Sequence, residues 1–360
     1  MLKINFSDKV FSKESTGKST VVIHRILINQ KPQIGKKMNK DPFSSLNFPE
    51  PLITKDLLSI ANFFKSSESR CGIYLFSLPD DLFYIGQSLD VVKRFVQHKK
   101  NHPIIHSFSF LPTYRCDLDK VEQEKISEAQ KKGILLANKE YVQDIIGETD
   151  FDLLVSKYEQ DAWLDQKNYD NKDSIRIDDI LHRKRFIPEF NRFLNNPMHE
   201  EVIHLFKKYV SRCVPYPKRT EFSFWSVSCC PTTNQNTFPR LVCVNMNMME
   251  TFVIGYEKEN INDFWAFINV SKSEFEKCRK KIVNRFNPDI FLNRRNYKCA
   301  AGDSLTIHAS LNTMDHLLEK KEILEASRIL NLRLMRKGAT VLYSRYHCFQ
   351  LADCIFENKR

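Results

Sequence analysis

The chain lacks several features that would assign it quickly to a class of protein. No two of its ten cysteines are spaced as C-x-x-C, so structural zinc sites have no sequence support and free thiols in a reducing compartment are expected. Glycine (9) and proline (14) are scarce in 360 residues, which excludes collagen-like and low-complexity chains. No apolar run approaches the roughly 20 residues that cross a bilayer, and the N-terminus has no apolar secretory stretch. These absences favour a cytoplasmic protein that does not enter a membrane.

The charge balance is basic and unevenly distributed. Net charge is +11, which favours polyanionic partners such as DNA. Residues 1–40 hold nine Lys or Arg against Asp8 and Glu14, so nine minus two, or +7, of that charge lies there. Three interpretations stay open for this basic N-terminal segment, which we extend to residue 50. It is a nucleic-acid-binding arm, a targeting peptide, or an extension upstream of a natural start at Met38.

The basic segment contains an incomplete phosphate-binding motif. Gly17, Lys18 and Ser19 match the end of a P-loop, but Ser12 stands where that motif needs its first glycine. Without this glycine the backbone cradle for phosphate is not expected to form. A polar turn is therefore the interpretation that we adopt.

Residues 51–150 predict a small α/β domain with the element order β-β-α-β-α after an initial helix. Short apolar runs flank an acidic turn, which is typical of a β-hairpin, and two segments of helical periodicity follow. Asp119 is the expected N-cap of the second helix, and Gly133 is expected to end it. The expected elements are a helix at 53–66, strands at 71–77 and 82–86, a helix at 90–100, a strand at 106–112 and a helix at 118–132.

Residues 151–175 are expected to form a linker, and residues 176–360 an α+β accessory domain. Two sets of helices should flank a run of strands, and strands should close the chain. Arg294, Arg295 and Lys298 lie close to Phe291 and Tyr297, as cations and aromatic rings do at nucleic-acid surfaces, although a solvated basic loop is the more ordinary explanation. The expected elements are helices at 176–194, 198–212 and 312–336, and strands at 221–230, 239–256, 264–270 and within 338–356.

The most informative pattern lies in and after the expected hairpin. Its two strands contain the tripeptides Gly72–Tyr74 (GIY) and Tyr84–Gly86 (YIG). Arg94 and His98 follow four residues apart, so both lie on one side of the expected helix. Glu122 stands near the start of the next helix.

Each of these residue types can perform one of the tasks in the hydrolysis of a phosphodiester bond. A water molecule must lose a proton and attack phosphorus, while the developing negative charge is stabilised. A tyrosine takes the proton if a nearby cation lowers its pKa. An arginine presents a planar fork to phosphate, and a carboxylate holds one Mg²⁺ whose remaining ligands are waters.

Together these residues resemble the GIY-YIG nuclease superfamily, over residues 68–148 and not beyond. Both tripeptides match the motif that names the family. The arginine and histidine of the family's helix fall on Arg94 and His98. Its metal-binding glutamate falls on Glu122, and its structural asparagine falls on Asn138.

The resemblance implies a role for each catalytic candidate. Tyr74 would act as the general base or orient the water, and Tyr84 would position the water or the phosphate. Arg94 would bind that phosphate, with His98 supporting the phosphate or Tyr74. Glu122 would hold Mg²⁺ or Mn²⁺.

Other residues have supporting or alternative roles. Gly86, Lys93 and Asn138 are the candidate substrate-binding residues, and Gly86 would permit a close approach of the backbone. Glu124 and Glu128 lie on the same expected helix as Glu122 and are the alternative metal ligands.

The sequence thus predicts a metal-dependent DNA endonuclease that uses tyrosine-activated water and one metal ion. It predicts no small-molecule cofactor. The accessory domain at 176–360 is expected to bind the target, a protein partner or a second copy of the chain. The alternative function is a nucleic-acid-binding module that no longer cleaves.

Overall fold

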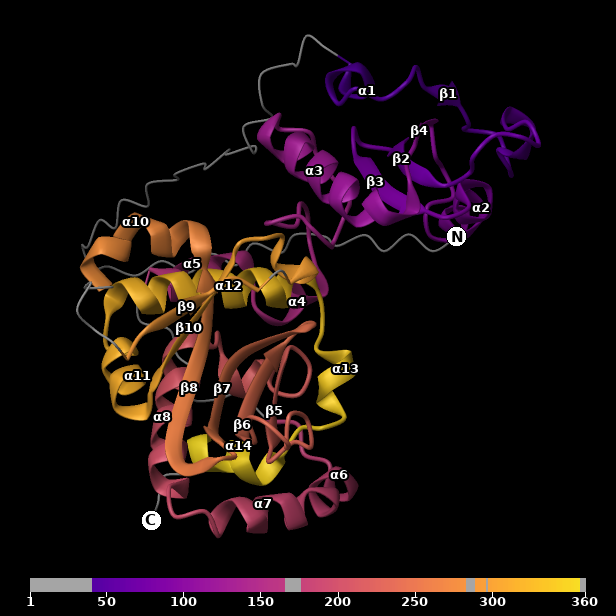
Figure 1. Ribbon diagram of the computed structural model, residues 1–360. Coiled ribbons are helices and arrows are strands. Elements are labelled where there is room, and N and C mark those ends of the chain that lie inside the picture. The colour runs from indigo at the N-terminus through magenta and orange to yellow at the C-terminus, as the bar shows by residue number, and fades with distance from the viewer. Residues whose placement is uncertain (1–40, 166–175, 283–288, 296, 357–360) are drawn as a thin grey trace, which may run out of the picture. The chain divides into compact units, whose positions relative to one another are not determined.

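The computed structural model describes residues 41–165, 176–282, 289–295 and 297–356 (Figure 1). Most of the basic N-terminal segment, including the incomplete P-loop motif at 17–19, lies outside these residues. The described part is a mixed α/β structure with one small antiparallel sheet and one larger sheet, each accompanied by helices. None of the described helices is long and apolar enough to cross a membrane.

The small sheet has four strands in the order β1-β4-β2-β3. Every pair of neighbours runs antiparallel, so the expectation of a mixed sheet is corrected. The one parallel contact recorded beside it is a single bridge between Phe83 and Leu136. The strands are β1 (Leu52–Ile53), β2 (Gly72–Ser77), β3 (Phe83–Ser88) and β4 (Ser107–Pro112).

The hairpin of β2 and β3 forms as the sequence predicts. Its register pairs Tyr74 with Gly86 and Phe76 with Tyr84. Asp80 and Asp81 in the connecting turn both have positive φ, at 60° and 55°. Aspartate tolerates this left-handed conformation better than most residues, which explains why two of them occupy the turn.

Helix α2 (Val91–Asn101) packs against one face of the small sheet. Asp90 caps its N-terminus, because the carboxylate accepts hydrogen bonds from the backbone N–H groups of Val92 and Lys93. Phe95 and its apolar neighbours on the helix are buried against Phe76. This burial fixes which side of α2 faces the sheet, and with it the direction of Arg94 and His98.

Helix α3 (Leu118–Lys131) packs against the opposite face. Its N-cap residue is Asp117, which makes no side-chain capping bond, so the expected cap at Asp119 is corrected. Gly133 follows the helix with φ at +72°, as expected of a residue that ends a helix.

Two segments before β2 differ from expectation. Residues 53–66 form no α-helix: Thr54 instead bonds to the backbone of His106 and Ile105, and only η1 (Ala61–Phe63) is helical, as one 3₁₀ turn. Residues 41–50, assigned to the basic segment, contain helix α1 (Pro42–Ser45). The buried side chains of Phe43, Leu46 and Phe48 in this segment form part of the core beneath α3.

The larger sheet has six strands in the order β5-β6-β7-β8-β10-β9, all antiparallel to their neighbours. The predicted strands at 221–230, 239–256 and 264–270 fall on β5 to β8. The last two strands, β9 and β10, were not predicted. The strands are β5 (Trp225–Cys229), β6 (Arg240–Met246), β7 (Met249–Glu257), β8 (Asn260–Ser271), β9 (Phe291–Asn293) and β10 (Ser304–Ser310).

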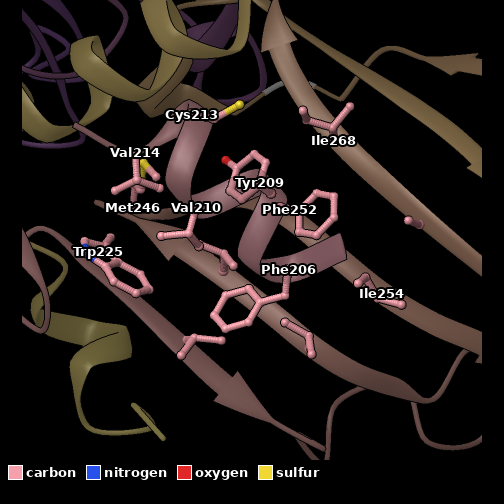
Figure 2. Packing of buried hydrophobic residues seen from close by; sticks show 14 of the residues in the cluster. Phe206, Tyr209, Val210, Cys213, Val214, Trp225, Met246, Phe252, Ile254 and Ile268 are labelled. Atoms are coloured by element: carbon pink, nitrogen blue, oxygen red, sulfur yellow. The ribbon is translucent and has the colours of Figure 1, made fainter. Parts of the chain in front are cut away.

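Helices cover one face of this sheet. Helix α8 (His199–Cys213) lies across β5 to β8, and its Tyr209 stacks on Phe252 at a ring separation of 4.4 Å (Figure 2). Burial of such large aromatic side chains contributes about 1.5–3 kcal/mol each to folding. Helix α12 (Lys321–Lys337) completes this cover together with α11 (Leu311–Leu317) and α14 (Phe349–Phe356).

Helices replace two segments that were expected to lack them. Residues expected to begin the linker at 151–175 form α4 (Asp150–Leu154) and α5 (Lys157–Leu164), each opened by a capping box. The expected closing strands at 338–356 are α13 (Val341–Ser344) and α14. The remaining helices are α6 (Ile180–Arg185), α7 (Ile187–Leu194), α9 (Pro217–Thr220) and α10 (Lys272–Ile282).

Candidate active site

Tyr74 and Tyr84 lie on the same face of the β2–β3 hairpin. Tyr74 pairs with Gly86 and Tyr84 with Phe76, two positions along, so alternation points both rings to the side covered by α2. Their ring centroids are 6.2 Å apart with the planes inclined by 19°. Tyr74 is fully buried, whereas Tyr84 is partly exposed. One tyrosine is thus held in the interior while the other reaches solvent.

Helix α2 brings Arg94 and His98 to the Tyr74 hydroxyl. The oxygen lies 2.8 Å from Nε2 of His98 and 3.3 Å from Nε of Arg94. The ring of His98 also lies 4.7 Å from that of Tyr84. Two residues of one helix therefore contact the hydroxyl of a single strand residue.

The proton positions in this cluster follow from counting donors and acceptors. Arg94 can only donate, so the buried O–H of Tyr74 has Nε2 of His98 as its acceptor. This arrangement leaves one unpaired group, the N–H at Nδ1 of His98, which is buried without a partner among the described residues. The opposite tautomer leaves two unpaired groups, the Tyr74 hydroxyl proton and the lone pair at Nδ1. The first arrangement therefore has the lower cost in free energy.

Burial sets the protonation of all three groups. It raises the pKa of Tyr74 well above its ordinary value, an effect that the neighbouring Arg94 offsets only in part. Burial also raises the pKa of Tyr84. Burial and the nearby charge of Arg94 lower the pKa of His98 to about 4, so this imidazole is neutral at pH 7 and its Nε2 can accept the Tyr74 hydrogen bond.

Gly86 leaves the space that the Tyr74 ring occupies. A Cβ at this position would lie 2.4 Å from the Tyr74 hydroxyl oxygen and 2.5 Å from Cζ. The sequence predicts that Gly86 permits a close approach, and in the structure the group that approaches is the catalytic candidate Tyr74.

Glu122 lies on the opposite face of the sheet from the Tyr74 cluster. It lies on α3, and its Oε2 accepts a hydrogen bond of 3.0 Å from the side chain of Gln87 on β3. Burial raises the pKa of Glu122 to about 7. Its charge in turn raises the pKa of both Tyr74 and Tyr84, so the three groups share one electrostatic environment around β3. No distance below 4 Å joins Glu122 to either tyrosine among the contacts that the described residues make.

The surroundings of Glu122 fit a divalent cation. Among the described residues, no Lys, Arg or His forms an ion pair with it, and its raised pKa means that a nearby positive charge would favour the ionised form. No group of three or more acidic, His or Cys side chains gathers in the described part of the chain. If Glu122 holds Mg²⁺, it would be one protein ligand of an ion whose other ligands are waters.

The alternative ligands are less suitable. Glu128 is paired with Lys132 at 2.6 Å and with Lys125 at 3.5 Å, and the bond from Lys132 lowers its pKa. Glu124 is exposed. Asp119 shares the Gln87 amide with Glu122 but is paired with Lys298 at 3.0 Å.

The candidate substrate-binding residues differ in their placement. Asn138 is buried, and its side chain bonds to both the N–H and the C=O of Ile85 at 3.1 and 2.6 Å. That is a structural contact with the YIG strand rather than a group open to substrate. Lys93 has a side chain that is 82% exposed and lies 3.9 Å from Asp90.

Three residues of the site were not predicted. Gln87 holds Glu122, Gln97 accepts a bond of 3.2 Å from Arg94, and His102 stacks 6.1 Å from His98. Strand alternation beside Gly86 and helical spacing from Arg94 and His98 were the signals that could have identified them.

Comparison of the chain with protein-family models, with curated proteins and with solved structures finds no match.

Proposed function

We propose that residues 68–148 form a metal-dependent endonuclease domain that hydrolyses phosphodiester bonds in DNA. The observation that carries the proposal is the Tyr74 hydroxyl, which contacts both a neutral imidazole and a guanidinium in the interior of the domain. Residues of a water-activating relay and of a phosphate clamp are thus in contact before any substrate binds. The resemblance of both tripeptides to the GIY-YIG nucleases supports the same chemistry.

In this proposal Tyr74 acts as a relay rather than as a pre-formed tyrosinate. Its raised pKa keeps the hydroxyl protonated in the resting site. When substrate binding admits the attacking water to the Tyr74 oxygen, the water gives its proton to that oxygen and Tyr74 passes its own proton to Nε2 of His98. The second transfer follows the existing hydrogen bond to His98, so no isolated buried anion forms.

Arg94 and Tyr84 orient the scissile phosphate. Arg94 is exposed at the side of the hydroxyl cluster, where its guanidinium provides a fork for two non-bridging oxygens. The partly exposed Tyr84 hydroxyl can donate to the phosphate or hold the attacking water. Glu122 is the residue that would hold Mg²⁺ or Mn²⁺, which when bound supplies neutralisation of phosphate charge and of the leaving oxygen.

The test is cleavage of supercoiled plasmid with added Mg²⁺ or Mn²⁺. We expect nicked or linear product from the full chain and none with Arg94→Ala or Glu122→Ala, while Glu122→Ala keeps its DNA affinity within a few fold. Glu124→Ala is the matched control on α3 and should cleave normally. Full activity of Glu122→Ala would show that another residue holds the metal.

One observation favours the alternative of a DNA-binding domain that does not cleave. The strong shift that keeps Tyr74 protonated makes it a poor base by itself. Binding of DNA by the full chain without any cleavage, and unchanged in Arg94→Ala, would support this alternative.

A further inference from the structure

The face of the large sheet that the helices leave open has its own set of side chains. Phe252, Ile254 and Ile268 point to the helical side (Figure 2). The residues between them belong to a separate small cluster on the opposite face, formed by Cys243, Val253, Phe267 and Trp265. An antiparallel sheet with one face free of helices can bind a ligand across its strands.

A hollow of about 500 Å³ lies on this open face. Aromatic side chains form much of its lining. Trp265 and Phe267 stack with centroids 6.0 Å apart and planes inclined by 6°, and the ring of Phe238 stands edge-on to Trp265 at 6.0 Å. Phe291 on β9 is 66% exposed. Phe267 is buried beneath Trp265, whereas Phe238 and Phe291 are exposed and Trp265 is partly exposed. Aromatic rings that reach solvent close together are the usual platform for flat ligands.

Two arginines line the same hollow. The guanidinium of Arg295 lies 5.2 Å from the centroid of Phe267. Arg240 has a side chain that is only 9% exposed and is paired with Glu250. Its Nε is nevertheless buried without a hydrogen-bond partner among the described residues, and so is Nε1 of Trp265. Both unpartnered atoms are donors, so the missing partner is an acceptor.

The remaining charges indicate which kind of ligand fits. Glu257, Asp263 and Asp289 also line the hollow, and all three are exposed. These carboxylates repel the phosphates of single strands and of duplexes alike, but a duplex also keeps its base faces stacked and its amines paired. Unpaired bases present flat faces to the rings, and their exocyclic amines donate to carboxylates. The lining therefore fits separated nucleotides better than a closed double helix.

We propose that this hollow binds an unpaired segment of the DNA on which the nuclease domain acts. Bases stack on Trp265, Phe238 and Phe291, and Arg295 contacts the backbone phosphates. The assignment of DNA rests on the proposed nuclease function. The preference for unpaired strands does not depend on the nuclease function, because it is argued only from the side chains on the open face.

The experiment measures binding by the full chain without divalent metal, so that cleavage does not intervene. The probe is a single-stranded oligodeoxynucleotide of mixed sequence of about 15 nucleotides, with its duplex and the matching RNA as comparisons. Trp163 and Trp225 are fully buried whereas Trp265 is not, so quenching of tryptophan fluorescence reports on the hollow.

The variants are Phe291→Ala and Arg295→Gln, each with a matched control. Tyr158→Ala removes an aromatic side chain that is 82% exposed on α5. Arg279→Gln removes an exposed arginine that, like Arg295, lies beside a glutamate. We expect the affinity for single strands to fall about tenfold in each test variant and to stay unchanged in each control. Unchanged melting temperatures exclude unfolding as the cause.

Three results would overturn the proposal: no quenching, equal binding of duplex and single strand, or equal affinity in the test variants and controls. RNA bound about tenfold more tightly than DNA would overturn the assignment of DNA. Plasmid cleavage is scored separately with added metal. Cleavage together with any of the first three results would reject the binding role of the hollow and retain the nuclease proposal. Selective binding of single strands without cleavage would reject the nuclease proposal and retain the binding role of the hollow.

Discussion

The hydroxyl oxygen of Tyr74 and Nε2 of His98 lie 2.8 Å apart in the interior of the small domain, with neither side chain open to water. Transfer of the tyrosine proton to the imidazole along this contact needs no rearrangement, but it must overcome the lowered pKa of His98. The Tyr74–His98 pair therefore communicates with solvent only through two neighbouring side chains, the exposed Arg94 and the partly exposed Tyr84.

Replacing Tyr74 with Phe removes the relay and keeps the ring. We expect the cleavage rate to fall by about 10²- to 10⁴-fold, the range that positioned proton transfer supplies. The free energy of unfolding should fall by about 1–3 kcal/mol, because the hydrogen bonds with His98 and Arg94 are both lost and Nε2 of the buried His98 is left without its partner. Tyr114→Phe, at a site that is 82% exposed, is the control. Plasmid nicking and urea unfolding measure both effects, and a fully active Tyr74→Phe would remove Tyr74 from the chemistry.

Gly86→Ala tests the fit of strand β3 to the Tyr74 ring. The added Cβ would lie 2.4 Å from the hydroxyl oxygen, so the ring or the strand must shift. We expect a loss of about 1–3 kcal/mol in unfolding free energy, typical of overpacking, and cleavage lowered at least as much as in Tyr74→Phe. Thermal melting and nicking assays measure these quantities. Wild-type stability in Gly86→Ala would mean that the strand has more room than the structure gives it.

Glu122→Gln should stabilise the metal-free protein at alkaline pH. The folded-state pKa of Glu122 is about 7, against 4.5 in its ordinary environment. Below 4.5 the carboxyl is protonated in both folded and unfolded states, and stability is then lost as pH rises through 7. We expect the variant to be more stable than wild type by about 1–3 kcal/mol near pH 8 and equal to it near pH 4.5.

Urea unfolding in a chelator at both pH values measures the Glu122 effect. Added Mg²⁺ should narrow the difference near pH 8 by stabilising the wild type alone. A difference between the two proteins that does not change with pH would contradict the raised pKa.

His98 should produce the opposite dependence on pH. Its folded-state pKa of about 4 lies below the ordinary value of 6.5, so its contribution to stability is complete above 6.5 and is lost as pH falls to 4. His98→Gln keeps an acceptor for Tyr74 but does not titrate. We expect the stability of wild type relative to this variant to fall by about 2–3 kcal/mol across that window. Parallel stability curves for the two proteins would rule out the shift.

The residues around Tyr74 could be predicted because their arrangement is local. A tight hairpin fixes which strand residues share a face, and four-residue spacing on a helix fixes the pair Arg94 and His98. The bond from Gln87 to Glu122 could not be predicted in the same way. It joins residues 35 positions apart, and it depends on how α3 packs against the far side of the sheet.

The errors in the fold have similar causes. The apolar spacing at 53–66 suits a helix, yet Thr54 finds backbone partners beside β4 and the chain stays extended there. In the last segment, Phe349, Ala352 and Ile355 are buried at spacings of three, which is a helical period that we had interpreted as strand. Short apolar runs leave the choice between helix and strand to tertiary packing.

The side chain of Asn138 gives Ile85 the two backbone partners that a further strand would otherwise supply. Phe83, two residues earlier, is served in the same way by the backbone of Leu135 and Ala137. Strand β3, at one edge of the small sheet, thus has no free row of backbone donors and acceptors from Phe83 to Ile85. The small domain is thereby protected at this sheet edge from self-association, the route by which exposed strands recruit other chains into aggregates.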